Sequence, residues 1–259
     1  MSRTVVVGAS SGLGRCIGVG LARHGDRVAL LARRRQRIEA AAQEAGPNAF
    51  AIGCDVTDEA SCRSAIRAAA DALGGIDNLI YTPAVGPLVR MVDTDAETWR
   101  RVFDTNVIGA ALVTAAAVPH LTASAGKAVY LSSPAGTFGP PWPGLGAYGV
   151  SKAALERLVE AWRAEHPDIG FTCLIAGECA GGEGDAQTGM TIGWDMDLAM
   201  KAHPLWSSRG CMPGKLMPVE DLVEVVHTIL RTNSATSMPV VVARGAPASP
   251  AAFADSAQS

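Results

Sequence analysis

The stretch Thr4-Val5-Val6-Val7-Gly8-Ala9-Ser10-Ser11-Gly12-Leu13-Gly14 decides how this chain folds. Its β-branched run predicts a buried strand, and the apolar stretch after the glycines predicts a helix. Glycines between the two allow a tight turn, and the N–H groups that open the helix can face a phosphate. The spacing is G-x-x-x-G-x-G rather than the commoner G-x-G-x-x-G. The turn is therefore either a phosphate site or an ordinary glycine-rich connection.

Strand-like and helix-like stretches alternate along the rest of the chain. Further strands are predicted at 27–31, 49–53, 78–81, 128–132, 171–175 and 239–242. Helices are predicted at 13–24, 34–45, 58–73, 97–121 and 148–165. Several of the strands are almost continuously apolar, as in a parallel sheet that is covered on both faces. The pattern predicts an α/β fold with a Rossmann-type, doubly wound parallel sheet of about seven strands and helices on both faces.

Composition excludes several classes of protein. The chain has 259 residues, of which 48% are hydrophobic and 18% charged, so it has enough apolar material for a core. Its net charge of -3 gives no basic field for nucleic acid. The N-terminus lacks a signal-peptide pattern, no stretch is long and apolar enough to suggest a membrane span, and the six cysteines lack metal-site spacing. We expect a reduced, cytoplasmic protein with no metal, membrane or nucleic-acid partner.

Domain organisation follows from where the alternation breaks. We expect one domain over residues 1–245 and a flexible C-terminal tail at 246–259, which is rich in Ala, Pro and Ser. Residues 177–218 are long and rich in Gly and Met, and they interrupt the pattern before the last strand.

The end of the second predicted strand bears on the cofactor. In Rossmann-type sites an acidic residue there binds the 2′-hydroxyl of NAD, whereas an arginine suits the 2′-phosphate of NADP. Here Ala32 is followed by Arg33 and Arg34. A guanidinium pairs with phosphate and stacks on adenine. We favour NADP(H) over NAD(H), and the alternative is a solvated basic start of the next helix.

Tyr148 and Lys152 lie four residues apart at the start of a predicted helix. Residues at i and i+4 share one helix face, so the phenol and the ammonium would be neighbours. An ammonium beside a phenol favours the phenolate and lowers a pKa that starts near ~10. Such a tyrosine can donate a proton to an alkoxide or accept one from an alcohol. The spacing alone is common in helices and identifies no site.

Three further motifs precede this pair in the chain. They are Leu131-Ser132-Ser133-Pro134-Ala135-Gly136 at a strand end, Asp104-Thr105-Asn106-Val107-Ile108-Gly109 in a long helix, and Cys54-Asp55-Val56-Thr57 after the third strand. Together with the glycine turn, this ordered set resembles the short-chain dehydrogenase/reductase family. The resemblance covers about residues 3–176 and returns at 218–242.

The resemblance implies roles for individual residues. Tyr148 would be the catalytic acid/base, and Lys152 would lower its pKa and bind the nicotinamide ribose. Ser133 would orient the substrate carbonyl, and Asn106 would hold a water in a proton relay to the lysine. The implied cofactor-binding residues are Gly8, Ser10, Ser11, Gly12, Leu13, Gly14, Arg33, Arg34, Asp55, Val56, Tyr148, Lys152 and Gly177.

Four features depart from the family's pattern, and the first of them lies beside the cofactor. Tyr81-Thr82-Pro83-Ala84 stands where the family has Asn-Asn-Ala-Gly, a motif that secures the strand beside the cofactor. Pro83 removes a backbone donor, and Ala84 adds a Cβ where glycine allows close approach. This departure puts the affinity or the seating of the cofactor in question.

Two tryptophans are predicted on the substrate side. Trp142 lies in the rigid loop Gly139-Pro140-Pro141-Trp142-Pro143-Gly144. Trp194 lies in residues 177–218, which in this family form a lid over the substrate. The alternative is that these apolar residues pack on the core or on another subunit. We expect a bulky, hydrophobic substrate in contact with Ser133, Trp142, Tyr148 and Trp194.

The expected function is NADP(H)-dependent reduction of a carbonyl, or the reverse oxidation of a secondary alcohol. One alternative is a 3-oxoacyl-thioester reductase, and another is a cofactor-binding protein of the same fold without turnover. The resemblance implies a homodimer or homotetramer, with the helices around 97–121 and 148–165 packed against copies of themselves.

Overall fold

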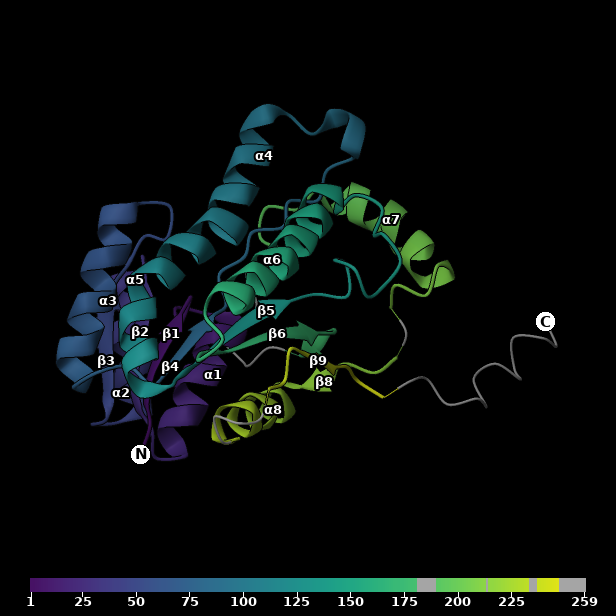
Figure 1. Cartoon of the computed structure of the whole chain (residues 1–259). Helices are drawn as coiled ribbons and strands as arrows, with labels where there is room; N and C mark the ends of the chain where they lie inside the picture. The colour runs from purple at the N-terminus through teal and green to yellow at the C-terminus, as the bar shows by residue number, and fades with distance from the viewer. Residues whose placement is uncertain (181–189, 213, 233–236, 247–259) are drawn as a thin grey trace.

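A seven-stranded parallel sheet forms the centre of the molecule, with the strand order β3-β2-β1-β4-β5-β6-β9 (Figure 1). The strands are β1 (Arg3–Val7), β2 (Arg27–Ala32), β3 (Ala49–Gly53), β4 (Asn78–Tyr81), β5 (Lys127–Ser132), β6 (Gly170–Ala176) and β9 (Val240–Ala243). The predicted Rossmann-type doubly wound sheet is confirmed. The strand order reverses between β1 and β4, and folds of this kind bind ligands at the carboxyl ends of the strands beside that point.

This computed structural model describes residues 1–180, 190–212, 214–232 and 237–246. Part of the predicted lid (181–189) and nearly all of the predicted tail (247–259) lie outside the described residues.

Helices cover both faces of the sheet. One face carries α1 (Gly12–Arg23), α2 (Arg35–Ala45) and α8 (Val219–Arg231), and the other carries α3 (Glu59–Leu73), α5 (Gly109–Ser124) and α6 (Gly146–Glu165). Successive residues of a strand point to opposite faces. Val5 and Val7 therefore join the core layer beneath α3 and α5, and Val6 joins the layer beneath α1 and α8.

The long helix predicted at 97–121 is present and contains a π-helical turn. It consists of α4 (Ala96–Phe103), a π-helical turn (Asp104–Ile108) and α5. Asn106 in that turn is fully buried, and its amide exchanges two hydrogen bonds with the backbone of Val85, at 2.8 and 3.0 Å. The Tyr81 hydroxyl donates to the Thr105 carbonyl at 2.5 Å. The predicted long helix is confirmed, and the π-helical turn inside it was not predicted because its partners, distant in sequence, hold an extra residue in the turn.

The same stretch corrects the expectation about membrane spans. Residues 96–124 form a continuous helical run whose most apolar window has a mean hydropathy of 1.6, which by length and composition alone is enough to cross a membrane. Val113, Ala117 and Leu121 of this run lie in the core beneath the sheet. One face of the helix therefore packs inside the protein.

Residues 177–218 contain regular structure that the sequence pattern did not reveal. The short strands β7 (Cys179–Ala180) and β8 (Met217–Pro218) pair in parallel, and α7 (Met196–Ser208) lies between them in the chain. Asp195 caps α7 by accepting hydrogen bonds from the N–H groups of Asp197 and Leu198. A single turn of 3₁₀ helix (Met91–Asp93) precedes α4.

Candidate active site

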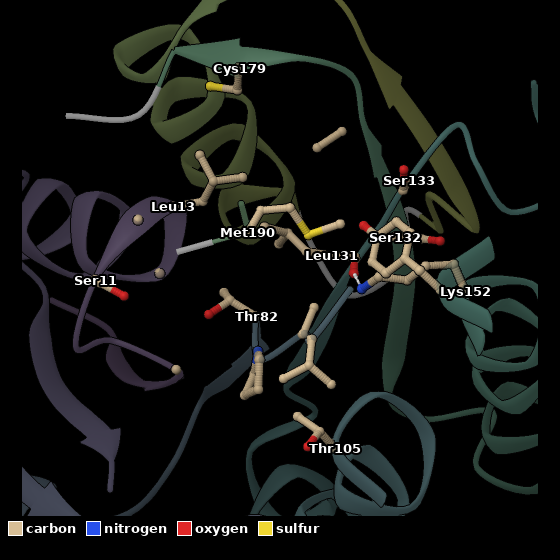
Figure 2. Close-up of a pocket in the computed structure, with 18 of the residues that line it drawn as sticks. Ser11, Leu13, Thr82, Thr105, Leu131, Ser132, Ser133, Lys152, Cys179 and Met190 are labelled. Atoms are coloured by element: carbon tan, nitrogen blue, oxygen red, sulfur yellow. Dashed lines mark hydrogen bonds between the residues drawn. The ribbon is translucent and has the colours of Figure 1, made fainter. Parts of the chain in front are cut away.

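A cavity of about 760 Å³ opens at the carboxyl ends of the strands (Figure 2). Most of the residues selected from the sequence line it. They are Gly8, Ser10, Ser11, Gly12, Leu13, Gly14, Arg33, Arg34, Val56, Ser133, Trp142, Tyr148, Lys152, Gly177 and Trp194. Asp55 and Asn106 are not part of the lining, and each acts on it through a neighbour. Ser11 and Leu13 stand on one side of the cavity in Figure 2, and Ser133 and Lys152 stand on the other.

The glycine turn wraps closely around the end of β4. Gly8 has a φ of +87°, which L side chains rarely adopt, and a Cβ there would lie 2.4 Å from the Thr82 hydroxyl. A Cβ at Gly14 would lie 2.3 Å from the same hydroxyl and 2.6 Å from the Gly8 carbonyl. Helix α1 begins directly at this turn, so its first N–H groups face the cavity. The turn therefore has the shape and the donors that a pyrophosphate requires.

The segment that departs from the family is held firmly. The Thr82 hydroxyl donates to the Val7 carbonyl at 2.7 Å, and the Thr82 N–H donates to the same oxygen at 3.1 Å. Three residues on, Val85 is held by Asn106. Threonine thus ties the end of β4 to the end of β1 and supplies the strand anchor that the altered motif placed in question. Sequence reasoning missed this role, because the partner carbonyl is 75 residues away.

Two arginines follow β2 and reach different places. Arg34 donates to the hydroxyls of Ser10 and Ser11 at 2.8 and 2.6 Å, so it lies over the phosphate turn. Arg33 is 67% exposed at the cavity mouth, and its guanidinium lies 4.0 Å from the Asp55 carboxylate. Burial works against the Asp55 charge, but hydrogen bonds from Thr57 and the charge of Arg33 leave the Asp55 pKa below its ordinary value. Arg33 is therefore a cation placed at the rim.

Tyr148, Ser133 and Lys152 form one group, in which Lys152 is buried and the other two are partly buried. The Tyr148 hydroxyl hydrogen-bonds Ser133; burial raises the pKa of Tyr148, and this hydrogen bond partly offsets the shift. The Lys152 ammonium lies 5.7 Å from the centroid of the Tyr148 ring and donates to the Leu131 carbonyl at 2.6 Å. Burial lowers the pKa of Lys152 to about 8. Proton donor, hydroxyl partner and cation thus meet at the cavity wall.

Asn106 supports the Ser133–Tyr148–Lys152 group through hydrogen bonds to a neighbouring residue. Its amide donates to the Ser151 hydroxyl at 2.9 Å, and that hydroxyl donates to the Tyr148 carbonyl at 2.7 Å. Ser151 is the residue before Lys152. Asn106 therefore joins the π-helical turn, the backbone of Val85 and the start of α6, whereas the water relay implied by the resemblance stays a prediction.

Glu156 is a residue of this site that sequence reasoning missed. Its carboxylate accepts a hydrogen bond from the Ser132 hydroxyl at 2.7 Å and another from the Thr137 hydroxyl. It follows Lys152 by one helical turn, and its charge partly offsets the effect of burial on the Lys152 pKa. Its place four residues after a catalytic-type lysine was the available signal. Glu156 fastens the loop that carries Ser133 to the helix that carries Tyr148.

Three tryptophans from separate segments form the outer wall. Trp142 and Trp206 have ring centroids 5.4 Å apart, and Trp194 and Trp206 have centroids 6.0 Å apart. The Trp194 indole donates to the Gly86 carbonyl, and the Trp206 indole donates to the Pro143 carbonyl, both at 2.8 Å. Met190 lies beside them in the same apolar cluster. Trp142 and Trp194, the two tryptophans predicted to contact the substrate, both pack against Trp206, which lies in the same predicted lid.

The geometry fits a dinucleotide at one end and an apolar molecule at the other. Gly8 and Gly14 let the turn close on Thr82, where a Cβ would collide, and helix α1 begins directly at that turn, so its first N–H groups can meet a pyrophosphate. Ser133, Tyr148 and Lys152 line the same cavity as this turn and the tryptophans Trp142, Trp194 and Trp206, where Tyr148 can exchange a proton with an oxygen atom.

Comparison with known proteins identifies the family. The family model for short chain dehydrogenases matches residues 2–181. The chain belongs to the short-chain dehydrogenase/reductase family of oxidoreductases.

Two curated relatives illustrate the match. The chain is 35% identical over 179 residues to 11-beta-hydroxysteroid dehydrogenase-like 3 of Arabidopsis thaliana, which is 67% of this chain and 57% of that protein. It is 32% identical over 216 residues to a Xanthobacter autotrophicus protein named inactive 2-(S)-hydroxypropyl-CoM dehydrogenase 2, which is 82% of this chain and 90% of that one. For four curated relatives, the match spans 58% of their length or less.

Solved structures show the same fold. An alcohol dehydrogenase of the archaeon Thermococcus sibiricus, solved with 5-hydroxy-NADP, has a TM-score of 0.79 at 23% identity over 96% of this chain and 99% of that one. A 3-ketoacyl-(acyl-carrier-protein) reductase of Brucella melitensis, solved with NADH, has a TM-score of 0.78 at 22% identity over 93% and 96%.

Substitution of Glu156 tests whether this residue holds the loop of Ser133 to helix α6. Glu156→Leu is expected to lower the free energy of unfolding by about 1–3 kcal/mol, because the buried Ser132 hydroxyl loses its acceptor. Glu156→Gln keeps an acceptor for Ser132 and is expected to cost less. Urea unfolding measures both.

Glu160→Leu, one turn further along α6, is the matched control. Glu160 pairs with Arg157 at the surface, so its loss is expected to cost about 0.5 kcal/mol or less. Equal costs at positions 156 and 160 would contradict the role given to Glu156.

Proposed function

We propose that this chain is an NADP(H)-dependent ketoreductase or secondary-alcohol dehydrogenase that acts on a hydrophobic, bulky substrate. The observation that carries the proposal is that Ser133, Tyr148 and the buried Lys152 line the same cavity as the glycine turn and the tryptophans. Buried titratable groups with shifted pKa values in a cavity of this kind are typical of catalytic sites. The family supports the reaction type.

The mechanism follows from the geometry. When bound, a reduced nicotinamide supplies a hydride to the carbonyl carbon of the substrate. Tyr148 donates its proton to the carbonyl oxygen as negative charge develops there, and the Ser133 hydroxyl orients the same oxygen. The Lys152 ammonium, near the Tyr148 ring, stabilises the phenolate that results. In the oxidation direction, Tyr148 accepts the proton from the alcohol.

Arg33 and Arg34 support a preference for NADP(H). Each carries a positive charge after β2, where the adenosine ribose lies in Rossmann-type sites. The Arg33 guanidinium is largely exposed to solvent at the cavity rim, so its side chain can rotate to pair with a 2′-phosphate. Arg34 covers the phosphate turn.

The tryptophan wall supports a large, apolar substrate. Trp142, Trp194 and Met190 line the same cavity as Tyr148, and flat aromatic surfaces bind rings and long apolar groups well. In this proposal residues 177–218 act as a lid. The described part contributes Trp194 and Trp206, whose indole groups fasten it to the loops at Gly86 and Pro143.

A second candidate is a protein that binds the cofactor without turnover. The Xanthobacter relative whose name calls it inactive favours keeping it. The 3-oxoacyl-thioester alternative differs only in substrate, and an assay panel that includes an acyl-thioester separates it.

The homodimer or homotetramer stays a prediction, and light scattering would measure the oligomeric state. Ile108 and Val150, each 47% exposed, give it an apolar face on the π-helical turn and α6.

Replacement of the tyrosine tests the reaction. Tyr148→Phe is expected to lower the rate of ketone reduction by about 100- to 10,000-fold, because the proton donor is lost. NADPH binding, followed by fluorescence, is expected to persist. A panel of bulky ketones with NADPH supplies the rates.

Tyr130→Phe is the matched control, since the Tyr130 hydroxyl is buried against Thr114 and away from the cavity. If the wild-type protein binds NADPH but reduces no ketone in the panel, the second candidate is preferred. Unchanged reduction by Tyr148→Phe would remove Tyr148 from the mechanism.

The pKa of Lys152 predicts a pH dependence. Burial lowers it to about 8, so the ammonium is charged below that pH and neutral above it. The ratio kcat/KM for the cofactor, which reports groups of the free protein, is expected to fall as the pH rises through about 8. Lys152→Met is expected to lose most activity and this fall together. A wild-type profile that stays flat to about pH 10 would contradict the assignment.

Arginine substitution tests the cofactor preference. Arg33→Ala is expected to raise the Kd for NADPH about tenfold or more and to leave the Kd for NADH nearly unchanged, because only NADPH carries the 2′-phosphate. Fluorescence titration measures both constants. Arg35→Ala is the control, since Arg35 is exposed and pairs with Glu39. Equal weakening of NADPH and NADH binding would show that Arg33 reads another part of the cofactor.

A further inference from the structure

Three side chains with metal-binding atoms converge on the surface of α1 and α8, outside the cavity. His24 is the residue that ends α1, and Glu224 and His227 lie three residues apart on α8. His24 and Glu224 are separated by 200 residues in the chain. No spacing motif connects them, so only the fold reveals the cluster.

Tight packing of the two helices holds the cluster together. Helices α1 and α8 lie side by side on one face of the sheet (Figure 1). A Cβ at Gly20 would lie 2.5 Å from the Val223 side chain, so the glycine allows α8 to approach α1 closely. Val223 is the neighbour of Glu224, and Gly20 lies one turn before His24. The backbones that carry the three side chains are therefore fixed by the core.

The distances suit a shared ligand. His24 Nε2 lies 2.7 Å from Glu224 Oε1, and His227 Nδ1 lies 3.9 Å from Glu224 Oε2. One ligand atom from each of the three residues lies within 4.8 Å of the other two. A tetrahedral zinc site with bonds of about 2.0–2.1 Å places its ligand atoms roughly 3.3–3.5 Å apart. One separation is to Oε1 of Glu224 and the other to Oε2, and the His24 and His227 rings are stacked with centroids 4.2 Å apart. Rotation of the side chains would direct one atom of each residue at a shared ion.

The chemistry of the three side chains favours one class of metal ion. Two imidazoles and one carboxylate are the ligands of three-residue zinc sites, which leave a fourth position for water. Imidazole nitrogen favours zinc, nickel and copper over magnesium and calcium. We propose that His24, Glu224 and His227 form a binding site for a divalent transition-metal ion, with zinc as the type case.

Charge and exposure agree with this assignment. His24 ends α1, where unpaired carbonyls give a helix its negative end and favour a cation. Glu224 adds a carboxylate whose side chain is 60% exposed, and His227 is 19% exposed. An ion can therefore enter from solvent and meet a half-buried ring.

The position of the site indicates a structural role. The phosphate turn opens α1 and His24 ends it, so the 12 residues of the helix place about 18 Å between the two. A metal ion there would cross-link α1 to α8 and take no part in proton transfer. Its binding would stabilise the folded chain by mass action.

A metal titration of the full chain tests the proposal. After chelator treatment, the thermal midpoint is expected to rise saturably with ZnCl₂ and to stay constant with MgCl₂. Calorimetry is expected to give about one zinc ion per chain. His24→Ala and His227→Ala are each expected to raise the Kd for zinc about tenfold or more, and Glu224→Gln is expected to weaken binding as well.

His120→Ala, on α5, is the matched control and is expected to bind zinc as the wild type does. Each variant is compared with itself with and without zinc, so that any cost of the substitution to folding cancels. Cobalt replaces zinc to identify the ligands, because thiolate ligands give a charge-transfer band that histidine and glutamate ligands do not. A thiolate band, no saturable zinc effect, or zinc binding that survives all three substitutions would each overturn the proposal.

Discussion

The contact between the ends of β1 and β4 is the constraint on which the site depends. The Val7 carbonyl accepts two hydrogen bonds from Thr82, and Gly8 and Gly14 close around the same hydroxyl with no room for a Cβ. This contact sets where α1 begins and where the chain leaves β4. Since Asn106 holds the backbone of Val85 just beyond, the same anchor passes through the π-helical turn to α6. The glycine turn and the Ser133–Tyr148–Lys152 group are thus parts of one hydrogen-bonded frame.

Electrostatics at the site arise from burial inside that frame. A buried lysine tends to lose its proton and a buried tyrosine tends to keep it, so the Lys152 pKa falls and the Tyr148 pKa rises, and the two values move apart. Glu156 counteracts part of the shift on Lys152 while its hydrogen bonds hold the neighbouring loop.

Features that depend on local sequence pattern could be predicted from the sequence, whereas features that depend on long-range contacts could not. The strands and most helices follow from periodicity and turn chemistry, and the Tyr148–Lys152 pair follows from helical spacing. Thr82, Glu156 and Trp206 could not be selected in this way, because each owes its place to a partner in another segment. The π-helical turn at Asn106 has the same cause. The residues around Asn106 are all compatible with an α-helix, so the sequence does not indicate that the buried Asn106 amide will hold a π-helical turn there.

The pairing of β7 with β8 affects how the segment between these two strands can change during evolution. Cys179 lies opposite Met217, and the Met217 N–H donates to the Glu178 carbonyl at 2.9 Å, so the chain that leaves the sheet at Ala180 returns to the same point. Once two ends are fastened together, the entropic cost of the stretch between them rises only slowly, by about 0.6 kcal/mol for each doubling of its length. Insertions and deletions there would leave the β7–β8 pair and the frame around Thr82 and Asn106 in place. The segment between β7 and β8 can therefore change in length and composition while the rest of the cavity stays the same.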